Sequence, residues 1–164
     1  FLYERLFNFL KDLGYSNEIV DALVSSRPEK IHDILERLEA ISEFVKLKES
    51  ETLSSANKRV SNILKKADKI SINPIDENLL IENEEIMLHK VLLDLEPKIN
   101  QCLIKNDFIS ALKNLVILNT PINNFFEKVM VNADDSKIKN NRYSLLFKLR
   151  QNLNCVADIS KLAS

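Results

Sequence analysis

The segment ANKRVSNILKK, residues 56–66, has the spacing of an amphipathic helix, although about half of its residues are cations or amides. Counted at about 100° per residue from Leu53, the apolar side chains fall within an arc of roughly 100°. They are Leu53, Ala56, Val60, Ile63, Leu64 and Ala67. The opposite side carries Lys58, Arg59, Asn62, Lys65 and Lys66. This pattern predicts a helix over about residues 53–68 that buries one side in a helical core.

We call the five residues Lys58, Arg59, Asn62, Lys65 and Lys66 the basic face. No carboxylate interrupts it between residues 53 and 67, whereas acids and bases are mixed elsewhere, as in residues 29–40. One interpretation is a solvated surface whose lysines favour the C-terminal end of the helix dipole. The other is a phosphate-contacting surface on which Arg59 and Asn62 reach the hydrogen-bonding edges of bases. The residues alone leave both interpretations open.

The composition of the chain favours an all-α fold. The 164 residues include a single glycine, 45% hydrophobic residues and 29% charged residues. Sheet proteins need glycines for turns and bulges, and this chain has almost none. We therefore expect a bundle of seven or eight helices. Their expected ranges are about 2–13, 16–26, 31–44, 53–68, 84–105, 107–118, 121–131 and 136–162, with a loop over about 69–83.

Three kinds of local signal set these boundaries. Gly14 follows the first apolar run, where a helix C-cap is expected, and Ser16 or Asn17 is the expected N-cap of the second helix. Pro121 is expected as the first residue of its helix. The segment NADDS, residues 132–136, is expected to form a capping turn before the last helix.

The last helix carries an unusual arginine. Measured from Ile138, its apolar stripe holds Leu145, Leu149, Leu153 and Val156, and Arg142 falls inside it. A buried charge without a partner costs several kcal/mol, so Arg142 needs an acceptor or a polar ligand. The expected acceptors are Asp134, Asp135 and Asp158. Arg142 is then either a structural residue that ties the preceding turn to the helix or a direct ligand contact.

Aromatic residues define a second possible contact surface on the same helix. Tyr143 and Phe147 are expected on its exposed side, with Lys139 and Arg150 nearby. Exposed aromatics beside cations suit stacking of single-stranded bases, which contributes ~1–3 kcal/mol per base. Packing against another helix or domain is the alternative. Phe125 and Phe126 are expected in the core.

Several kinds of chemistry lack support in the residues. His32 and His89 lie far apart, and Cys102 and Cys155 have neither CxxC spacing nor a neighbouring histidine. One glycine excludes phosphate-binding glycine loops, and no catalytic site or metal site is expected. The net charge of −1 gives no global attraction to nucleic acid. No apolar run reaches membrane-spanning length, no signal peptide is expected, and reduced cysteines suit the cytoplasm.

Two long segments resemble a known family. ANKRVSNIL (56–64), followed by PINNFFEKVMVNADDSKIKNNRYSLLFKLR (121–150) and VADIS (156–160), resembles the C-terminal region of the bacterial glycyl-tRNA synthetase beta subunit. That region carries the helical DALR anticodon-binding module. FLYERLFNFLKDLGY (1–15) and SSRPEKIHDILERLEAI (25–41) resemble the helices that precede the module. The resemblance covers essentially the whole chain, and Asn132 departs from it because a more apolar residue is usual there.

The resemblance implies a role in a larger enzyme. That enzyme activates glycine with ATP and Mg²⁺ and attaches it to its tRNA, with a class II active site in the alpha subunit and an assembly of two alpha and two beta subunits. This chain, which begins at Phe1 without an initiator Met, is then expected to be a non-catalytic fragment. Residues 1–52 are expected to form a helical segment packed on an anticodon-binding bundle over residues 53–164.

The resemblance also suggests how the site residues work. The glycine anticodon ends in two cytosines, so its reader needs hydrogen-bond acceptors as well as donors. The amides of Asn57, Asn62, Asn140 and Asn141 can supply both, while Lys58, Arg59, Lys65 and Lys66 hold phosphates. Two alternatives remain. One is the anticodon domain of arginyl-tRNA synthetase, whose usual ending differs from VADIS. The other is a protein-interaction module that docks through Tyr143 and Phe147.

Overall fold

Helices account for all the regular structure in residues 1–67 and 73–164, which the computed structural model describes. The eight α-helices within these ranges are α1 (Leu2–Asp12), α2 (Asn17–Ser25), α3 (Ile34–Phe44), α4 (Ser50–Lys66), α5 (Asn83–Ile104), α6 (Phe108–Asn114), α7 (Asn119–Lys128) and α8 (Ser136–Leu153). Four 3-10 turns accompany them: η1 (Ile31–Asp33), η2 (Glu77–Leu79), η3 (Leu115–Leu118) and η4 (Ile159–Leu162). The all-α prediction is confirmed. The predicted end of the fourth helix at residue 68, and residues 69–72 of the predicted loop, lie outside the described ranges.

The predicted capping residues end and begin helices as expected. Gly14 follows α1 with φ of 95°, a left-handed conformation that glycine adopts at little cost. Ser16 caps α2, where its hydroxyl accepts a hydrogen bond from the Ile19 N–H. Asp135 caps α8, where one carboxylate oxygen accepts from two backbone N–H groups. These side chains satisfy N–H groups that have no partner inside the helix.

Several predicted boundaries are wrong by three residues or more: α3 begins later, α4 begins earlier, and α6, α7 and α8 end earlier than expected. Helix α7 begins at Asn119, so Pro121 stands in its first turn rather than at its first residue. The last helix ends at Leu153, nine residues before the predicted end at 162, and η4 follows separately. Tertiary contact explains the early end of α8: the Asp158 N–H donates to the Ala22 carbonyl at 2.9 Å, which holds the chain after α8 against α2.

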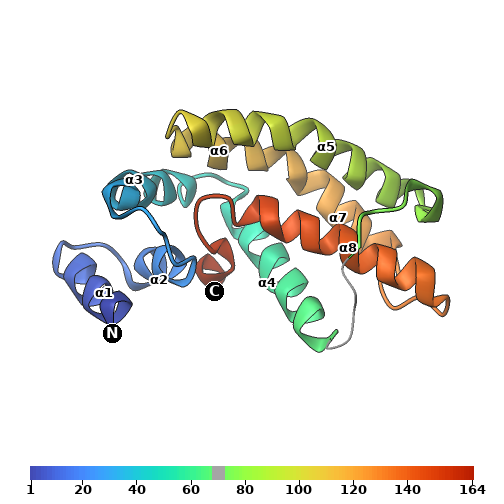
Figure 1. Ribbon diagram of the computed structural model, residues 1–164, viewed down its shortest axis with the longest axis horizontal. Coiled ribbons are helices and arrows are strands. Elements are labelled where there is room, and N and C mark those ends of the chain that lie inside the picture. Colours follow the sequence, from blue (N-terminus) through green and yellow to red (C-terminus); the bar gives the residue numbers. More distant parts are fainter. Residues whose placement is uncertain (68–72) are drawn as a thin grey trace.

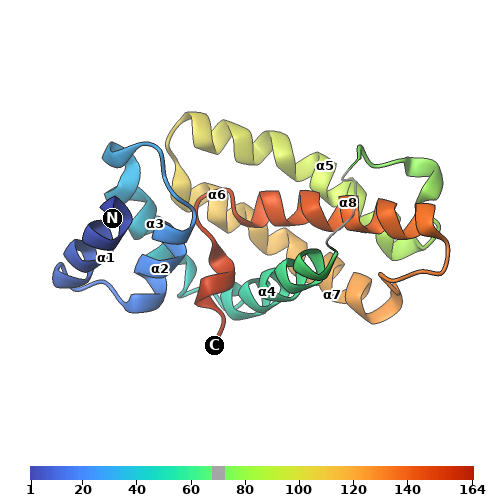
Figure 2. The same cartoon turned by 60° about the horizontal axis from the view of Figure 1, so that its bottom comes forward.

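Helix α8 occupies the middle of the molecule (Figure 1). It lies between α4 on one side and α5 on the other, while α7 runs behind it and α6 packs against α3 and α5. Helices α1, α2 and α3 gather at one end of the molecule, and the second view shows the same arrangement (Figure 2). The C-terminal turn η4 packs against both α2 and α4. Because helices surround α8, it has no fully exposed face along its centre.

Burial on α8 follows from this central position. All six residues from 141 to 146 are buried, although an isolated amphipathic helix exposes about half of any such run. The apolar core itself is continuous from Leu10 in α1 to Ile159 in η4. The N-terminal helices therefore share one core with the rest of the described chain. The division at residue 52 into a preceding segment and a module stays a prediction.

The connection between α5 and α6 uses one residue in an unusual conformation. Asn106 has φ of 53°; its N–H donates to the Leu103 carbonyl, and the Asp107 N–H donates to the Cys102 carbonyl at 2.8 Å. This is the paired C-terminal arrangement that ends many helices. Asp107 then caps α6, and its hydrogen bonds with Ser110 lower the pKa of its carboxyl below the ordinary value.

Candidate nucleic-acid interface

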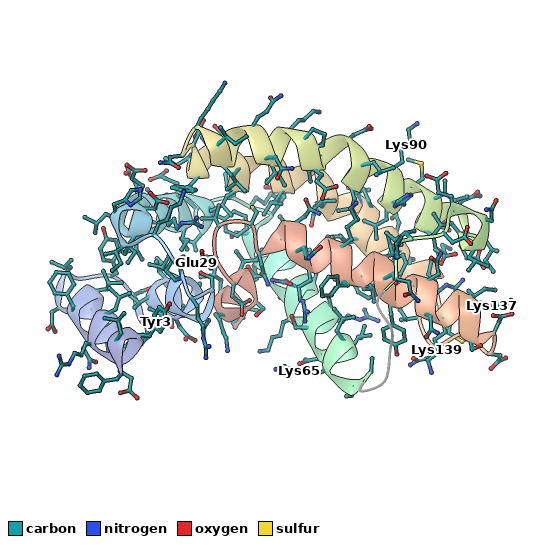
Figure 3. All side chains as sticks on the ribbon, in the orientation of Figure 1. Tyr3, Glu29, Lys65, Lys90, Lys137 and Lys139 are labelled. Atoms are coloured by element: carbon teal, nitrogen blue, oxygen red, sulfur yellow. The ribbon has the colours of Figure 1, made fainter. Side chains whose placement is uncertain are left out.

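The basic face lies exposed along α4. Lys58, Arg59, Asn62, Lys65 and Lys66 are all exposed, while the other side of the helix packs into the core through Leu53 and Val60. Lys65 projects from the far end of α4, away from the bulk of the molecule (Figure 3). Among the described residues, no carboxylate lies within 4.0 Å of a basic-face cation. The face therefore carries positive charge that no acid in the described chain neutralises.

Asn57 does not belong to this surface, and its predicted role in reading a base is wrong. Its side chain is fully buried, and its Nδ2 donates to Asn154 Oδ1 at 2.7 Å. The reason is positional: Asn57 follows Leu53 by four residues, which places it on the buried stripe of the helix. The contact joins α4 to the end of α8.

Arg59 lies at the edge of the basic face, beside α7. Its guanidinium carbon lies 4.2 Å from the centre of the Phe126 ring. Phe126 is half-buried, and its ring meets that of the fully buried Phe125 edge to face, with 5.4 Å between centres. Phe125 is thus in the core as predicted, whereas Phe126 lies at the boundary between core and surface.

The arrangement opens a groove between α4 and α7. Its volume is about 620 Å³. One wall consists of α4 residues together with Lys48, which lies just before α4, and the other consists of α7 residues at three- and four-residue steps. The lining residues are Lys48, Glu51, Thr52, Ser55, Ala56, Arg59, Asn123, Phe126 and Glu127. The small side chains of Ser55 and Ala56 leave the space between the helices open.

Asn141 is buried, so its predicted role in reading a base is also wrong. Its Oδ1 accepts from the Asp76 N–H at 2.8 Å, and its Nδ2 donates to the Asp76 carbonyl at 2.9 Å. The side-chain amide thereby pairs with the backbone of the segment after residue 72. Asn140 is half-buried and lines a small hollow with Lys137 and Asn73. An RNA contact by Asn140 stays a prediction.

Arg142 forms a buried ion pair that the sequence did not predict. Its Nε donates to Glu85 Oε1 at 2.7 Å, and its Nη2 donates to Glu85 Oε2 at 3.2 Å. Its Nη1 donates to the Met130 carbonyl. Both side chains are almost completely buried. Arg142 is therefore a structural residue that ties α8 to α5 and to the turn before α8, and it does not face solvent.

Glu85 is the acceptor that sequence reasoning missed. The three expected acceptors, Asp134, Asp135 and Asp158, form no ion pair with Arg142. A helical wheel shows which side of a helix is buried, but not which helix packs against that side. A signal was nonetheless present: Glu85 lies on the buried stripe of α5 that continues through Leu88, Leu92, Leu95 and Ile99. Two isolated opposite charges on two apolar stripes predict a pair.

The predicted aromatic platform on α8 is only partly exposed. Tyr143 is buried, and its hydroxyl donates to Asn132 Oδ1 at 2.7 Å, so the prediction that it is exposed is wrong. This bond also uses the polar side chain of Asn132. Phe147 and Arg150 are both half-buried, with the guanidinium carbon 5.5 Å from the ring centre. Of the two aromatic residues predicted to dock on a partner through α8, only Phe147 keeps some exposed surface.

Comparison with known proteins identifies the family to which this chain belongs. The family model described as the DALR anticodon binding domain matches residues 53–159, from within α4 to the start of η4. The chain belongs to this family.

Relatives of this DALR domain extend the similarity beyond residues 53–159. The chain is 46% identical over all 164 residues to the glycine–tRNA ligase beta subunit of Ralstonia nicotianae. It is 42% identical over its full length to the same subunit from a Janthinobacterium species, and 40% identical to that from Nitrosomonas europaea. The chain spans 23% of the length of each of these relatives.

The described part of the DALR chain contains no candidate metal-binding group, no membrane-crossing helix, and a cysteine whose thiol pKa is raised. No group of three or more His, Cys, Asp or Glu side chains could hold a metal ion within residues 1–67 and 73–164. In the same ranges, no helix combines the length and the apolar character that crossing a membrane requires. Burial raises the pKa of the Cys155 thiol to about 12, which keeps it protonated at neutral pH.

Proposed function

We propose that this chain is the anticodon-binding region of a glycine–tRNA ligase beta subunit, and that the basic face of α4 contacts the phosphates of the anticodon stem-loop. One observation carries the proposal. The part of the chain that matches the DALR anticodon binding domain begins in α4, the helix whose exposed cations have no acidic partner among the described residues.

The geometry of α4 supports phosphate contacts. Lys58, Lys65 and Lys66 extend from an ordered helix into solvent, where an incoming phosphate need not displace a protein carboxylate. Each contact releases counterions from the nucleic acid, which favours binding at low salt. Asn62 lies among these lysines and can donate to or accept from a base edge. Because the net charge of the whole chain is −1, this local charge must guide the RNA.

Three further predicted contacts remain part of the proposal. Asn140, Phe147 and Arg150 are half-buried on α8, so each retains some surface for RNA. Arg150 and Phe147 form a cation–aromatic contact on one side of the helix. The buried residues Asn57, Asn141, Arg142 and Tyr143 are excluded from the interface and instead fix the positions of α4 and α8.

The wider assembly is also part of this proposal. In the complete enzyme, ATP and Mg²⁺ act in glycine activation at the alpha subunit, and two alpha and two beta subunits assemble. This region binds tRNA and performs no chemical step. The enzyme is expected in the cytoplasm, without membrane association. Similarity to glycine–tRNA ligase beta subunits over the whole chain supports these statements.

A comparison of tRNA transcripts tests the proposal. The complete beta subunit, assembled with its alpha subunit, is expected to retard a tRNA(Gly) transcript in a gel-shift assay. It should bind a transcript whose anticodon has been scrambled at least tenfold more weakly. Equal binding of the two transcripts would contradict anticodon recognition. Failure to bind either transcript, with the protein folded, would favour a protein-interaction module instead.

A further inference from the structure

The groove between α4 and α7 differs from the basic face in its charge. Lys48 and Arg59 contribute two cations to its lining, and Glu51 and Glu127 contribute two carboxylates. The groove is therefore formally neutral, whereas the lysines of the basic face are unpaired. Carboxylates repel phosphate, so this groove is unsuited to the RNA backbone. Its mixture of donors and acceptors suits the uncharged edge of a base.

The groove also contains a stacking surface. The Arg59 guanidinium carbon lies 4.2 Å from the centre of the Phe126 ring, a cation–aromatic contact, and both residues line the groove. Bases of single-stranded RNA stack on aromatic rings and on guanidinium planes. Phe125, which is fully buried, contacts the Phe126 ring edge to face. The stacking surface is thus supported from the core.

The polar groups around this surface suit a base that carries an amino group and a carbonyl. Glu127 is exposed, lines the groove and has no ion-pair partner in the described part of the chain. The other carboxylate, Glu51, already accepts a hydrogen bond from the Ser164 hydroxyl at 3.3 Å. A carboxylate accepts from the amino group of cytosine and repels the carbonyl oxygen that uracil has in its place. The amide of Asn123, one turn before Glu127, can donate to the carbonyl of the same base.

We propose that the groove between α4 and α7 binds an unpaired cytosine of the anticodon, with the base stacked on the Arg59–Phe126 pair and its amino group donating to Glu127. The inference rests on the proposed function and adds a division of labour to it. The lysines of α4 hold the backbone, while the adjacent groove reads one base. Arg59 belongs to both surfaces, because it stands at the edge of the basic face where the groove begins.

Two substitutions test the inference with the complete ligase and tRNA(Gly). Phe126→Leu keeps an apolar side chain but removes the ring, and it should weaken tRNA binding roughly tenfold or more, within the range for loss of base stacking. The dependence of affinity on salt should stay unchanged, because stacking releases no counterions. Asn124→Ala is the matched control, since Asn124 is exposed on α7 and does not line the groove.

Glu127→Gln tests the identity of the base, and because Glu127 is exposed this variant should fold normally. The natural protein should prefer tRNA(Gly) over transcripts in which one anticodon cytosine is replaced by uracil. In the Glu127→Gln variant the preference should fall at least fivefold for one of these transcripts, because an amide can donate to the uracil carbonyl. An unchanged preference would overturn the assignment of cytosine.

The outcomes also separate this inference from the proposed function. If Phe126→Leu and Glu127→Gln bind like the natural protein, while removal of the α4 lysines weakens binding, the groove does not read a base and the basic face retains its role. If tRNA(Gly) does not bind the natural ligase at all, the proposed function fails first. Should Phe126→Leu fail to fold, Glu127→Gln decides the question alone.

Discussion

Removal of Arg142 should destabilise the fold without touching any RNA contact. In Arg142→Met the Glu85 carboxylate stays buried but keeps only two of its hydrogen bonds, from the Ile81 and Glu82 N–H groups. The Met130 carbonyl also loses its donor. Breaking a buried pair from one side costs about 3–5 kcal/mol, since the remaining charge has no partner. In a domain of this size, that corresponds to a fall of roughly 6–20 °C in the melting temperature.

A double variant shows whether the two side chains act together. The amide introduced by Glu85→Gln is neutral and can still accept from the backbone N–H groups at the start of α5. Combining Glu85→Gln with Arg142→Met therefore leaves no buried charge at this site. We expect the double variant to be more stable than Arg142→Met alone, by about 1–3 kcal/mol. Urea unfolding followed by circular dichroism gives the free energy of unfolding of the two single variants and of the double variant.

Glu96→Gln provides the control for this cycle. Glu96 pairs with Lys148 at 3.0 Å at the surface, where such pairs contribute about 0–1 kcal/mol. If the effects of Glu85→Gln and Arg142→Met simply add, the two residues do not stabilise the fold as a pair. The account of how α8 is fastened to α5 would then be wrong.

Three smaller predictions concern other positions. Gly14→Ala should lower the free energy of unfolding by about 1 kcal/mol, as measured by thermal unfolding. The φ of Gly14 is 95° and no atom lies within 4 Å of an added Cβ, so the penalty is conformational rather than steric. Asn57→Ala should lower stability by about 1–2 kcal/mol, because Asn154 loses its donor, yet leave tRNA affinity of the folded protein unchanged. Burial raises the pKa of the Cys155 thiol to about 12, so the rate of its alkylation by iodoacetamide should rise roughly tenfold per pH unit between pH 8 and pH 11. A rate that reaches a plateau near pH 9 would indicate an ordinary thiol.

The helices themselves were largely predictable, because local signals determine them. The apolar periodicity of α5 predicts both of its ends to within a residue, Gly14 and Ser16 cap helices as expected, and the cap Asp135 lies in the predicted capping turn. Prediction failed at the end of α8. There a contact with α2, more than a hundred residues earlier in the chain, ends the helix at Leu153.

The candidate site was predictable only where one helix decides it. Exposure of the five residues on α4 follows from the pattern of α4 itself, since no other described helix covers that side. For α8 the same reasoning predicts that Tyr143 and Asn141 are exposed, but both are buried. Two surrounding helices and the segment after residue 72 cover α8, and a helical wheel contains no information about neighbours. The groove between α4 and α7 could not be predicted for the same reason, because its two walls belong to different helices.

Wrongly assigned amides have a common physical cause. Asn57 and Asn141 are predicted base readers because their amides can both donate and accept, yet each makes specific hydrogen bonds inside the protein. Asn141 pairs with both backbone groups of Asp76, as a neighbouring strand would. A buried polar side chain is usually hydrogen-bonded, so polarity alone does not indicate exposure. Position on the apolar stripe of α4 predicts the burial of Asn57 correctly.

The salt dependence of tRNA binding tests the central claim, that the basic face of α4 contacts RNA phosphates. The dissociation constant for tRNA(Gly) would be measured over a series of salt concentrations for the complete ligase and for the double variant Lys58→Ala/Lys65→Ala. Lys90→Ala/Lys98→Ala is the matched control, because both lysines are exposed on α5, and Lys90 projects from the opposite side of the molecule to Lys65 (Figure 3).

If both lysines of α4 contact phosphates, their removal should lower the slope of log affinity against log salt by about 1.4–1.8, at roughly 0.7–0.9 per contact. The control variant should keep the natural slope. An α4 variant with the natural slope and the natural affinity would contradict the claim and leave the basic face a solvated surface.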